Sequence, residues 1–308
     1  MTLPIITADI DRHLDWHGLL GAFERAHALP PAELDDTFLY RGDDTLLSRA
    51  AWIDGMGALV KTATIFPGNT DRGLAAVNGG VSLYSDADGT LEALLDFHLV
   101  TKWKTAGDSL FSASSLARPD SRKITLVGAG TVARSMVDAY RALFPDAHFT
   151  VWSRRFESAA QFARDLHGVQ PEADLKRAVE GADIICTATM SRAPLIQGDW
   201  LRPGQHLDLI GAFRPDMREV DDTALQRAAL FVDNRRTVLD HIGEMKDPLS
   251  RGVISHDDIC ADFYDIAAGR FVRPSPDAIT ICKNGGGAHL DLMTARYIFG
   301  VWQQAQGQ

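Results

Sequence analysis

Residues 124–136 read Ile-Thr-Leu-Val-Gly-Ala-Gly-Thr-Val-Ala-Arg-Ser-Met, and this stretch decides the fold. An apolar run leads into Gly128-x-Gly130-x-x-Ala133, which is followed by a segment with helical spacing. In such a motif the first glycine permits a tight turn, the second lets the backbone approach a pyrophosphate, and the small third residue allows close helix–strand packing. The start of the helix offers free N–H groups to phosphate. The stretch predicts a dinucleotide-binding turn in which Gly128, Gly130, Thr131 and Val132 contact the cofactor. The alternative is a glycine-rich turn without a ligand.

The chain beyond residue 119 alternates strands with helices. Apolar runs typical of strands lie at residues 123–130, 148–155, 182–189 and 206–213. Helical patterns lie at 131–144 and 157–168. Alternation of this kind indicates βαβ units and a parallel sheet. We therefore predict an α/β fold, with a Rossmann-type doubly wound parallel sheet in a dinucleotide-binding domain of residues 119–287.

The chain before Arg118-Pro119-Asp120 has a different character. Strand-like runs at 56–66 and 79–85 flank a turn segment, and residues 87–97 fit a hairpin with Asp88-Gly89 at its turn. A helix is expected at 101–117, and another at 288–308 ends the chain. These patterns predict an N-terminal α+β domain of residues 1–118.

The end of the 148–155 strand bears on the choice of cofactor. Sites that prefer NAD usually carry Asp or Glu here, to bind the ribose hydroxyls. This chain has Ser153, Arg154 and Arg155 instead. Guanidinium groups form charge-assisted, often bidentate bonds to a 2′-phosphate. NADP(H) is therefore favoured as the cofactor and NAD(H) is possible, while the alternative is a solvated basic turn.

Composition narrows the class of protein. The net charge of −10 over 308 residues argues against nucleic acid as a partner, since that needs a basic surface. Three scattered cysteines fit neither a disulfide framework nor a zinc site, so no metal is expected, and Cys186 and Cys282 are predicted to be buried thiols. No signal peptide or membrane-spanning stretch is apparent, so no membrane partner and a cytoplasmic location are expected.

Several segments in fixed order resemble one family. They are KTATIFPGNTDRGLAAVNGGVSLYSDADGTLEALLD (61–96), TKWKTAGDS (101–109), GAGTVA (128–133), GAFRPDMREVD (211–221) and CKNGGGAHLDLMTA (282–295). From about residue 37 onward the chain resembles the ornithine cyclodeaminase/mu-crystallin family. The resemblance implies a substrate-binding and dimerising N-terminal domain, a Rossmann domain, and a C-terminal helix that packs back on the first domain. It also implies a homodimer that uses a nicotinamide cofactor on a small amino or imino acid.

The resemblance also assigns roles to single residues. Lys61 matches the family's active-site lysine beside the substrate. Lys104 stands where most members have an arginine that binds the substrate carboxylate and approaches the cofactor, and lysine lacks the planar two-pronged fit. Arg41 is the candidate for a second carboxylate-binding arginine, with Arg49 as the alternative. Asp108 also departs from the family pattern, which usually has a small or hydroxyl residue at this position. It is expected to pair with Lys104 or with the substrate, and the alternative is an ion pair on the surface.

The remaining positions are expected around the cofactor and substrate. Asn284 matches a substrate-binding position, and Asn78 lies near the nicotinamide in the family, although a structural role in a turn is equally open. The other residues that the resemblance places at the cofactor are Thr105, Thr187, Thr189, Gly211, Phe213, Lys283 and Gly285.

The residue at position 213 bears on whether the reaction is a deamination or a reduction. In the cyclodeaminase branch this position holds an Asp that acts as acid and base, and Phe cannot transfer a proton. We therefore predict NAD(P)H-dependent reduction of a cyclic ketimine carboxylate, Δ1-pyrroline-2-carboxylate or Δ1-piperideine-2-carboxylate, to the L-amino acid. The alternatives are ornithine cyclodeamination, an alanine dehydrogenase-like reaction, or a non-catalytic NADPH-binding or small-ligand-binding protein.

Two further expectations concern the charged residues near Phe213 and a nearby histidine. Asp216, Arg218 and Glu219 are predicted to be capping or surface partners of a helix that starts near Asp221. His206 is predicted to be a surface turn residue.

Overall fold

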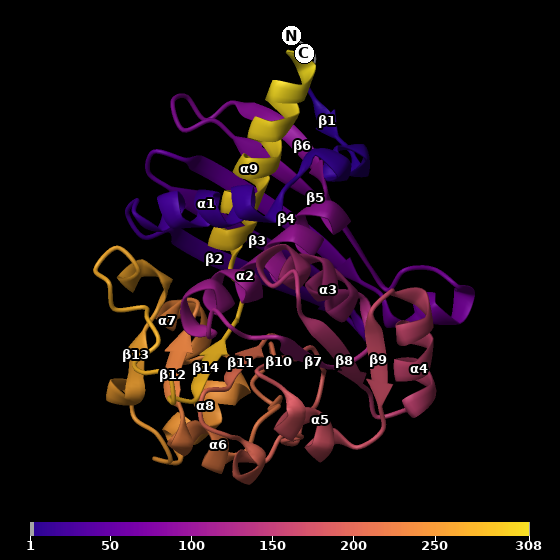
Figure 1. Ribbon diagram of the computed structural model, residues 1–308. Coiled ribbons are helices and arrows are strands. Elements are labelled where there is room, and N and C mark those ends of the chain that lie inside the picture. The colour runs from indigo at the N-terminus through magenta and orange to yellow at the C-terminus, as the bar shows by residue number, and fades with distance from the viewer. Residues whose placement is uncertain (1–2, 308) are drawn as a thin grey trace. The chain divides into compact units, whose positions relative to one another are not determined.

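The computed structural model describes residues 3–307, which form two compact units (Figure 1). The first unit contains the described chain up to Lys104 and again from Gly287 onward, and the second is Thr105–Gly286. The division thus falls inside helix α2 (Phe97–Leu116), whereas the sequence placed it at Pro119. The reason is that the second half of α2 packs on the second unit, where Ser109 contacts Tyr140.

The first unit is built on a six-stranded sheet in the order β1-β6-β5-β4-β3-β2. The strands are β1 (Ile5–Ile6), β2 (Glu33–Arg41), β3 (Asp44–Ile53), β4 (Gly57–Ile65), β5 (Val77–Tyr84) and β6 (Leu91–Asp96). All neighbours are antiparallel except β1 and β6. The strands expected at 56–66 and 79–85 and the turn at Asp88-Gly89 are confirmed, with Gly89 in the left-handed region at φ 69°.

Two long helices accompany this sheet. They are α1 (Trp16–His27) and α9 (Ala288–Gln306), and the short 3₁₀ helices are Ala8–His13 and Pro67–Arg72. Helix α9, yellow in Figure 1, contacts β3, β4 and β5 and packs against α1. Its first eight residues, 288–295, are all buried. The helix expected at the C-terminus is therefore confirmed, and it brings the end of the chain onto the N-terminal sheet.

The second unit is an eight-stranded parallel sheet in the order β13-β12-β14-β11-β10-β7-β8-β9. The strands are β7 (Lys123–Val127), β8 (His148–Trp152), β9 (Val169–Glu172), β10 (Ile184–Thr187), β11 (His206–Leu209), β12 (Ala229–Val232), β13 (Ile259–Ala261) and β14 (Thr280–Lys283). The strand order reverses between β7 and β10, and ligands of such folds bind at the carboxyl ends of strands at this switch point. The predicted Rossmann-type α/β fold is confirmed.

Short helices connect these strands. They are α3 (Thr131–Leu143), α4 (Phe156–Asp165), α5 (Leu175–Gly181), α6 (Asp222–Arg227), α7 (Arg235–Val238) and α8 (Gly243–Ser250), with 3₁₀ turns at Gly198–Trp200, His256–Asp258 and Phe263–Asp265.

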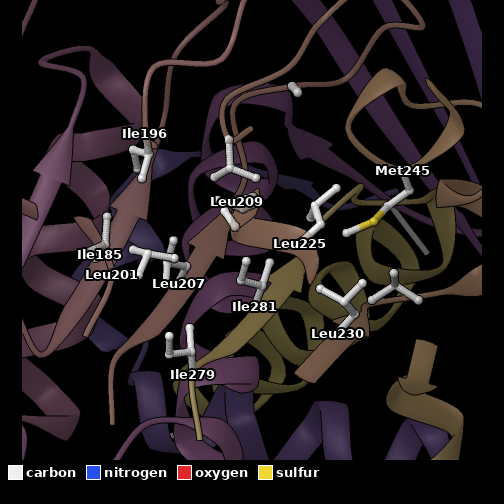
Figure 2. Packing of buried hydrophobic residues seen from close by; sticks show 14 of the residues in the cluster. Ile185, Ile196, Leu201, Leu207, Leu209, Leu225, Leu230, Met245, Ile279 and Ile281 are labelled. Carbon is white, nitrogen blue, oxygen red and sulfur yellow. The ribbon is translucent and has the colours of Figure 1, made fainter. Parts of the chain in front are cut away.

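Apolar side chains from neighbouring strands form the core of this unit. Figure 2 shows Ile185, Leu207 and Ile281 from β10, β11 and β14, with Leu201 and Leu225 beside them. All are at most 3% exposed. Strands covered on both faces read as continuous apolar runs, which is why the sequence indicated them.

No helix within the described part of the chain has the length and apolar character needed to cross a membrane. Residues 3–307 also contain no grouping of three or more His, Cys, Asp or Glu side chains suited to holding a metal ion.

Candidate functional site

Lys61 lies at the centre of a buried polar cluster in the first unit. Side chains of β4 alternate between its two faces, so Lys61 shares the buried face with Leu59 and Ala63. Its ammonium donates to Asp291 Oδ1 at 2.8 Å and to Thr101 Oγ1 at 2.7 Å. The strand alternation therefore places the Lys61 ammonium on the buried face of β4, where it needs these partners.

Two further cations surround the same carboxylate. Arg49 lies directly opposite Lys61 in the β3–β4 ladder, with Nη1 3.9 Å from Asp291 Oδ2. Lys104 is buried on α2, one helical turn beyond Thr101. Like charges opposite one another in a sheet destabilise it. Even with Asp36, which binds Arg49 at 2.6 Å, the cluster has three cations and two carboxylates. It is therefore suited to bind an anion.

Burial and charge together alter the acidity of this cluster. Burial lowers the pKa of Lys61, Asp291 opposes that change, and the charges of Lys104 and Arg49 add to the lowering. Burial alone would raise the pKa of Asp291, but Lys61, Lys104 and Arg49 lower it overall. Asp291 is thus held as a carboxylate, and Lys61 can release a proton more readily than an exposed lysine.

The structure brings Arg49, and not Arg41, to Lys61. Arg41 ends β2, pairs with Asp44 at 2.8 Å and has a side chain that is 79% exposed. Asp44 precedes Arg49 by five residues on β3, so Arg41 is roughly 17 Å along the sheet from the register of Lys61. Of the two candidates for the carboxylate-binding arginine, the structure thus places Arg49, and not Arg41, beside Lys61, and the binding of a carboxylate stays a prediction.

Asn78 shows the structural role that the sequence left open. It is exposed on β5, and its amide donates to Ala75 O at 3.0 Å, within the turn that precedes the strand. Its proximity to a nicotinamide stays a prediction.

The glycine turn after β7 has the geometry of a phosphate cradle. Gly128 has φ 121°, and a Cβ there would lie 2.6 Å from Ala188 O, so only glycine fits. A Cβ on Gly130, by contrast, would meet nothing within 4 Å, which leaves room for a ligand. Helix α3 begins at Thr131 without a side-chain cap, so its first N–H groups face this space. Val132 behind it is half-buried. These residues fit a dinucleotide pyrophosphate.

The segment after β8 adjoins this turn. Gly128 N donates to Trp152 O at 2.8 Å, which places Ser153 beside the glycine loop. Arg154 and Arg155 are exposed, and neither forms an ion pair with any described residue. Their guanidinium groups are thus available to a phosphate at this edge of the sheet.

Thr187, Thr189 and Gly211 contact one buried carboxylate, that of Glu219. Both threonine hydroxyls donate to it at 2.7 Å, and Gly211 N donates at 2.9 Å. Thr187 is fully buried, so its hydroxyl serves Glu219 and not a ligand. Glu219 itself is 0% exposed, and its prediction as a capping or surface residue is wrong because five donors of the protein enclose it.

Lys283 is also buried beneath the carboxyl ends of the strands. Its ammonium donates to Leu209 O at 2.5 Å and to Asn284 O at 2.9 Å, and it is 0% exposed. It therefore binds the ends of these strands from within the core, and its predicted contact with a cofactor stays a prediction. Gly285 is needed for packing, since a Cβ there would lie 2.6 Å from Val238 Cγ2.

Asn284 and Asp108 bind each other inside the second unit. The amide of Asn284 donates to Asp108 Oδ1 at 3.0 Å, which ties the end of β14 to α2. Asp108 is 0% exposed, so a surface ion pair is ruled out. In this arrangement Asn284 directs its amide to α2 and not to a substrate. Thr105 on α2 is half-buried, and Phe213, after β11, is 57% exposed.

His206 is a core residue and not the predicted surface residue. It lies in β11 with Nδ1 2.9 Å from Thr280 Oγ1 and Nε2 3.1 Å from Asp208 Oδ2. Asp208 also accepts from Tyr140 and Ser112. Cys186 and Cys282 flank Asp208 on the neighbouring strands and are buried as expected.

Sequence reasoning missed Asp291, Thr101 and Glu219. Asp291 carried a usable signal, because it is the only acid in the mainly apolar helical run of residues 288–295. A lone carboxylate in such a run must find a partner when the helix is buried. Glu219 carried no such signal, since it stands among other charged residues.

The chain is similar in sequence and in fold to several known proteins. Residues 52–306 match the ornithine cyclodeaminase/mu-crystallin family. A relative from Paracoccus denitrificans, a Delta(1)-pyrroline-2-carboxylate reductase, is 48% identical over 296 residues, covering 94% of each chain. The structure resembles Thermococcus litoralis Delta(1)-pyrroline-2-carboxylate reductase in complex with NADH and L-proline, with TM-score 0.90 and 25% identity over 99% of this chain and 98% of that one. It also resembles an archaeal alanine dehydrogenase dimer with bound NAD, with TM-score 0.89 and 27% identity over 99% and 98%. The chain belongs to the ornithine cyclodeaminase/mu-crystallin family.

Proposed function

We propose that this protein reduces a small cyclic imino acid, Δ1-pyrroline-2-carboxylate or Δ1-piperideine-2-carboxylate, to the corresponding L-amino acid. The observation that carries the proposal is the buried cluster of Lys61, Arg49 and Lys104 around Asp291. The similarity to reductases of Δ1-pyrroline-2-carboxylate supports it. Phe213 supports reduction over deamination, because it cannot serve as the acid and base of a cyclodeaminase.

The cluster matches both charges of such a substrate. Arg49 and Lys104 bind the carboxylate, and the cluster's excess of positive charge favours that anion. The ring nitrogen of the protonated imine carries a positive charge, which Asp291 offsets. Lys61, fixed by Asp291 and Thr101, orients the substrate and supplies the proton that makes this nitrogen cationic. When bound, a reduced nicotinamide supplies the hydride that converts C=N to CH–NH.

The cofactor proposed is NADPH. Its support is the pair Arg154 and Arg155 beside the glycine turn, with Ser153 in place of the acid typical of NAD sites. The two similar structures described above contain NADH and NAD, so the proposed preference for NADPH rests on these residues alone.

A homodimer is proposed as the working form. On one face of the β2–β3 hairpin, Phe38 and Tyr40 are 47% and 73% exposed, and their rings stack on each other. An apolar face of this kind marks an interaction surface. Light scattering should give the mass of two chains, and Tyr40→Lys should shift it toward one. A wild-type monomer would refute the dimer.

A panel of substrates tests the reaction. Purified protein should oxidise NADPH with either cyclic imine and should leave L-ornithine unchanged. Turnover of pyruvate with ammonium alone would indicate an alanine dehydrogenase-like enzyme. Conversion of L-ornithine to proline and ammonia, without imine reduction, would refute the proposal. Tight NADPH binding with no turnover of any compound would indicate a binding protein.

A further inference from the structure

Glu219 joins the segments that follow β10 and β11, just beyond the last paired residues of these strands, Thr187 and Leu209. Its Oε1 accepts from Thr189 N at 2.9 Å and Thr189 Oγ1 at 2.7 Å. Its Oε2 accepts from Thr187 Oγ1 at 2.7 Å, Gly211 N at 2.9 Å and Ala212 N at 3.1 Å. Strand β10 ends at Thr187, and Thr189 lies two residues beyond it. Gly211 and Ala212 lie just beyond the end of β11. One carboxylate therefore fixes the backbone at the carboxyl ends of both strands.

The geometry around this carboxylate is closely determined. Glu219 N donates to Glu244 Oε2 at 2.7 Å, and Glu219 O accepts from Leu195 N and Ile196 N. A Cβ on Gly211 would lie 2.4 Å from Glu219 Oε1 and 2.2 Å from Thr189 O. The glycine is thus what allows the two loops to meet at Glu219. Buried Lys283 supplies a positive charge to the same region.

The loop held by Glu219 forms one wall of the glycine turn. Ala188 lies between the two threonines, and its N donates to Val127 O at 2.8 Å. Ala188 O is the atom that a Cβ on Gly128 would approach to 2.6 Å. A shift of the 187–189 loop would therefore move the turn at which a pyrophosphate is expected.

We propose that Glu219 is a positioning residue for dinucleotide binding: it acts through Thr187, Thr189 and Gly211 to hold the strand ends beside the glycine turn in the conformation that accepts the cofactor. The inference rests on the proposed function for its ligand, a nicotinamide dinucleotide. It does not require that the substrate be an imine. A charged acceptor is needed because five donors converge on it, and an amide in its place would direct an NH₂ group at two or more of them.

Equilibrium binding of NADPH without any imine tests the proposal. We expect Glu219→Gln to raise the Kd for NADPH at least tenfold. The matched control is Asp208→Asn, which alters a carboxylate of equal burial in the same unit whose donors are the hydroxyls of Ser112 and Tyr140. Its Kd should stay within about threefold of wild type, because the amide keeps one acceptor and a hydroxyl can accept from its NH₂ group.

A milder pair of variants tests the same contact if Glu219→Gln does not fold. Thr187→Val removes one donor to Glu219 from a fully buried site and keeps the shape of the side chain, whereas Thr187→Ser keeps the hydroxyl. We expect Thr187→Val to raise the Kd for NADPH severalfold. Thr187→Ser should have the Kd of wild type. In kinetics the effect should fall on the KM for NADPH, with the KM for the imine unchanged.

Two results would overturn the proposal. One is a folded Glu219→Gln or Thr187→Val protein, with the far-UV spectrum of wild type, that binds NADPH as wild type does. The other is an equal loss of affinity in Asp208→Asn, which would show that Glu219 contributes only to the general stability of the unit. Because binding is measured without substrate, a wild type that binds NADPH but reduces no imine refutes the proposed function and leaves this test intact.

Discussion

At the scale of the residue, Lys61 shows how burial in the first sheet changes the acidity of a charged side chain. Its strand position dictates burial, burial lowers its pKa, and Asp291 opposes that change. A buried pair is costly to break, by about 3–5 kcal/mol, since one partner is then left as an uncompensated charge. Apolar side chains at these two positions would avoid the cost of burying charge. The presence of a buried ion pair there therefore supports a catalytic role for Lys61.

Removing the carboxylate should change the pH dependence of the reaction. Asp291 favours the protonated form of Lys61, so Asp291→Asn should lower the lysine's pKa further. A reaction that needs protonated Lys61 is lost as pH rises through that pKa. The alkaline limb of the kcat profile should therefore move to lower pH in Asp291→Asn. An unchanged limb would show that Lys61 is not the proton donor.

The two arginines after β8 should discriminate between cofactors. Each charge-assisted bond to a 2′-phosphate contributes about 1.5–3 kcal/mol, or roughly 10- to 150-fold in affinity. The double variant Arg154→Ser/Arg155→Ser should thus bind NADPH much more weakly and NADH nearly as well as wild type does. Fluorescence titration measures both constants, and NADH serves as the internal control. Equal losses for the two cofactors would contradict the assignment.

At the scale of the element, α1 and α9 meet through buried histidines. The ring of His27 on α1 lies 6.1 Å from that of His289 on α9, edge to face. Burial lowers the pKa of His27 from 6.5 to about 4, despite its hydrogen bond to Phe23 O, and burial also lowers the pKa of His289. Both rings are therefore neutral in the fold at pH 7.

This junction predicts loss of stability in acid. The folded-state pKa of His27 is depressed, so the stability it contributes is present above pH 6.5 and disappears as pH falls toward 4. The difference amounts to about 3 kcal/mol. Urea unfolding at pH 7 and pH 4.5 should show a smaller loss in His27→Phe than in wild type. An equal loss in both proteins would refute the prediction.

Elements also show where sequence reasoning succeeds. The strand, glycine turn and helix at 123–143 follow from local patterns, because the close approach of Gly128 to Ala188 O leaves no alternative residue. Helix α1 and the β2–β3 hairpin were not predicted. Nearly all of β2 is exposed in this chain, so its sequence lacks the alternation that one buried face would impose.

At the scale of the whole molecule, the residues that escaped prediction are those whose partners lie far along the chain. Lys61 and Asp291 are 230 residues apart, and they meet because α9 returns to the first sheet. The sequence favours Arg41 over Arg49 as the carboxylate-binding arginine, because only the β3–β4 register shows which of the two lies opposite Lys61. Glu219 looked like a surface charge because its five donors come from loops that only the folded sheet brings together.

The central claim is transfer of a hydride from reduced nicotinamide to the imine carbon of a cyclic imino acid bound by this chain. The most direct measurement uses NADPH dideuterated at C4 of its nicotinamide, Δ1-pyrroline-2-carboxylate, and mass spectrometry of the product. Our account predicts L-proline with one deuterium at the α-carbon, and none formed by Lys61→Met even though that variant still binds NADPH. Unlabelled proline, or no proline at all, would contradict it.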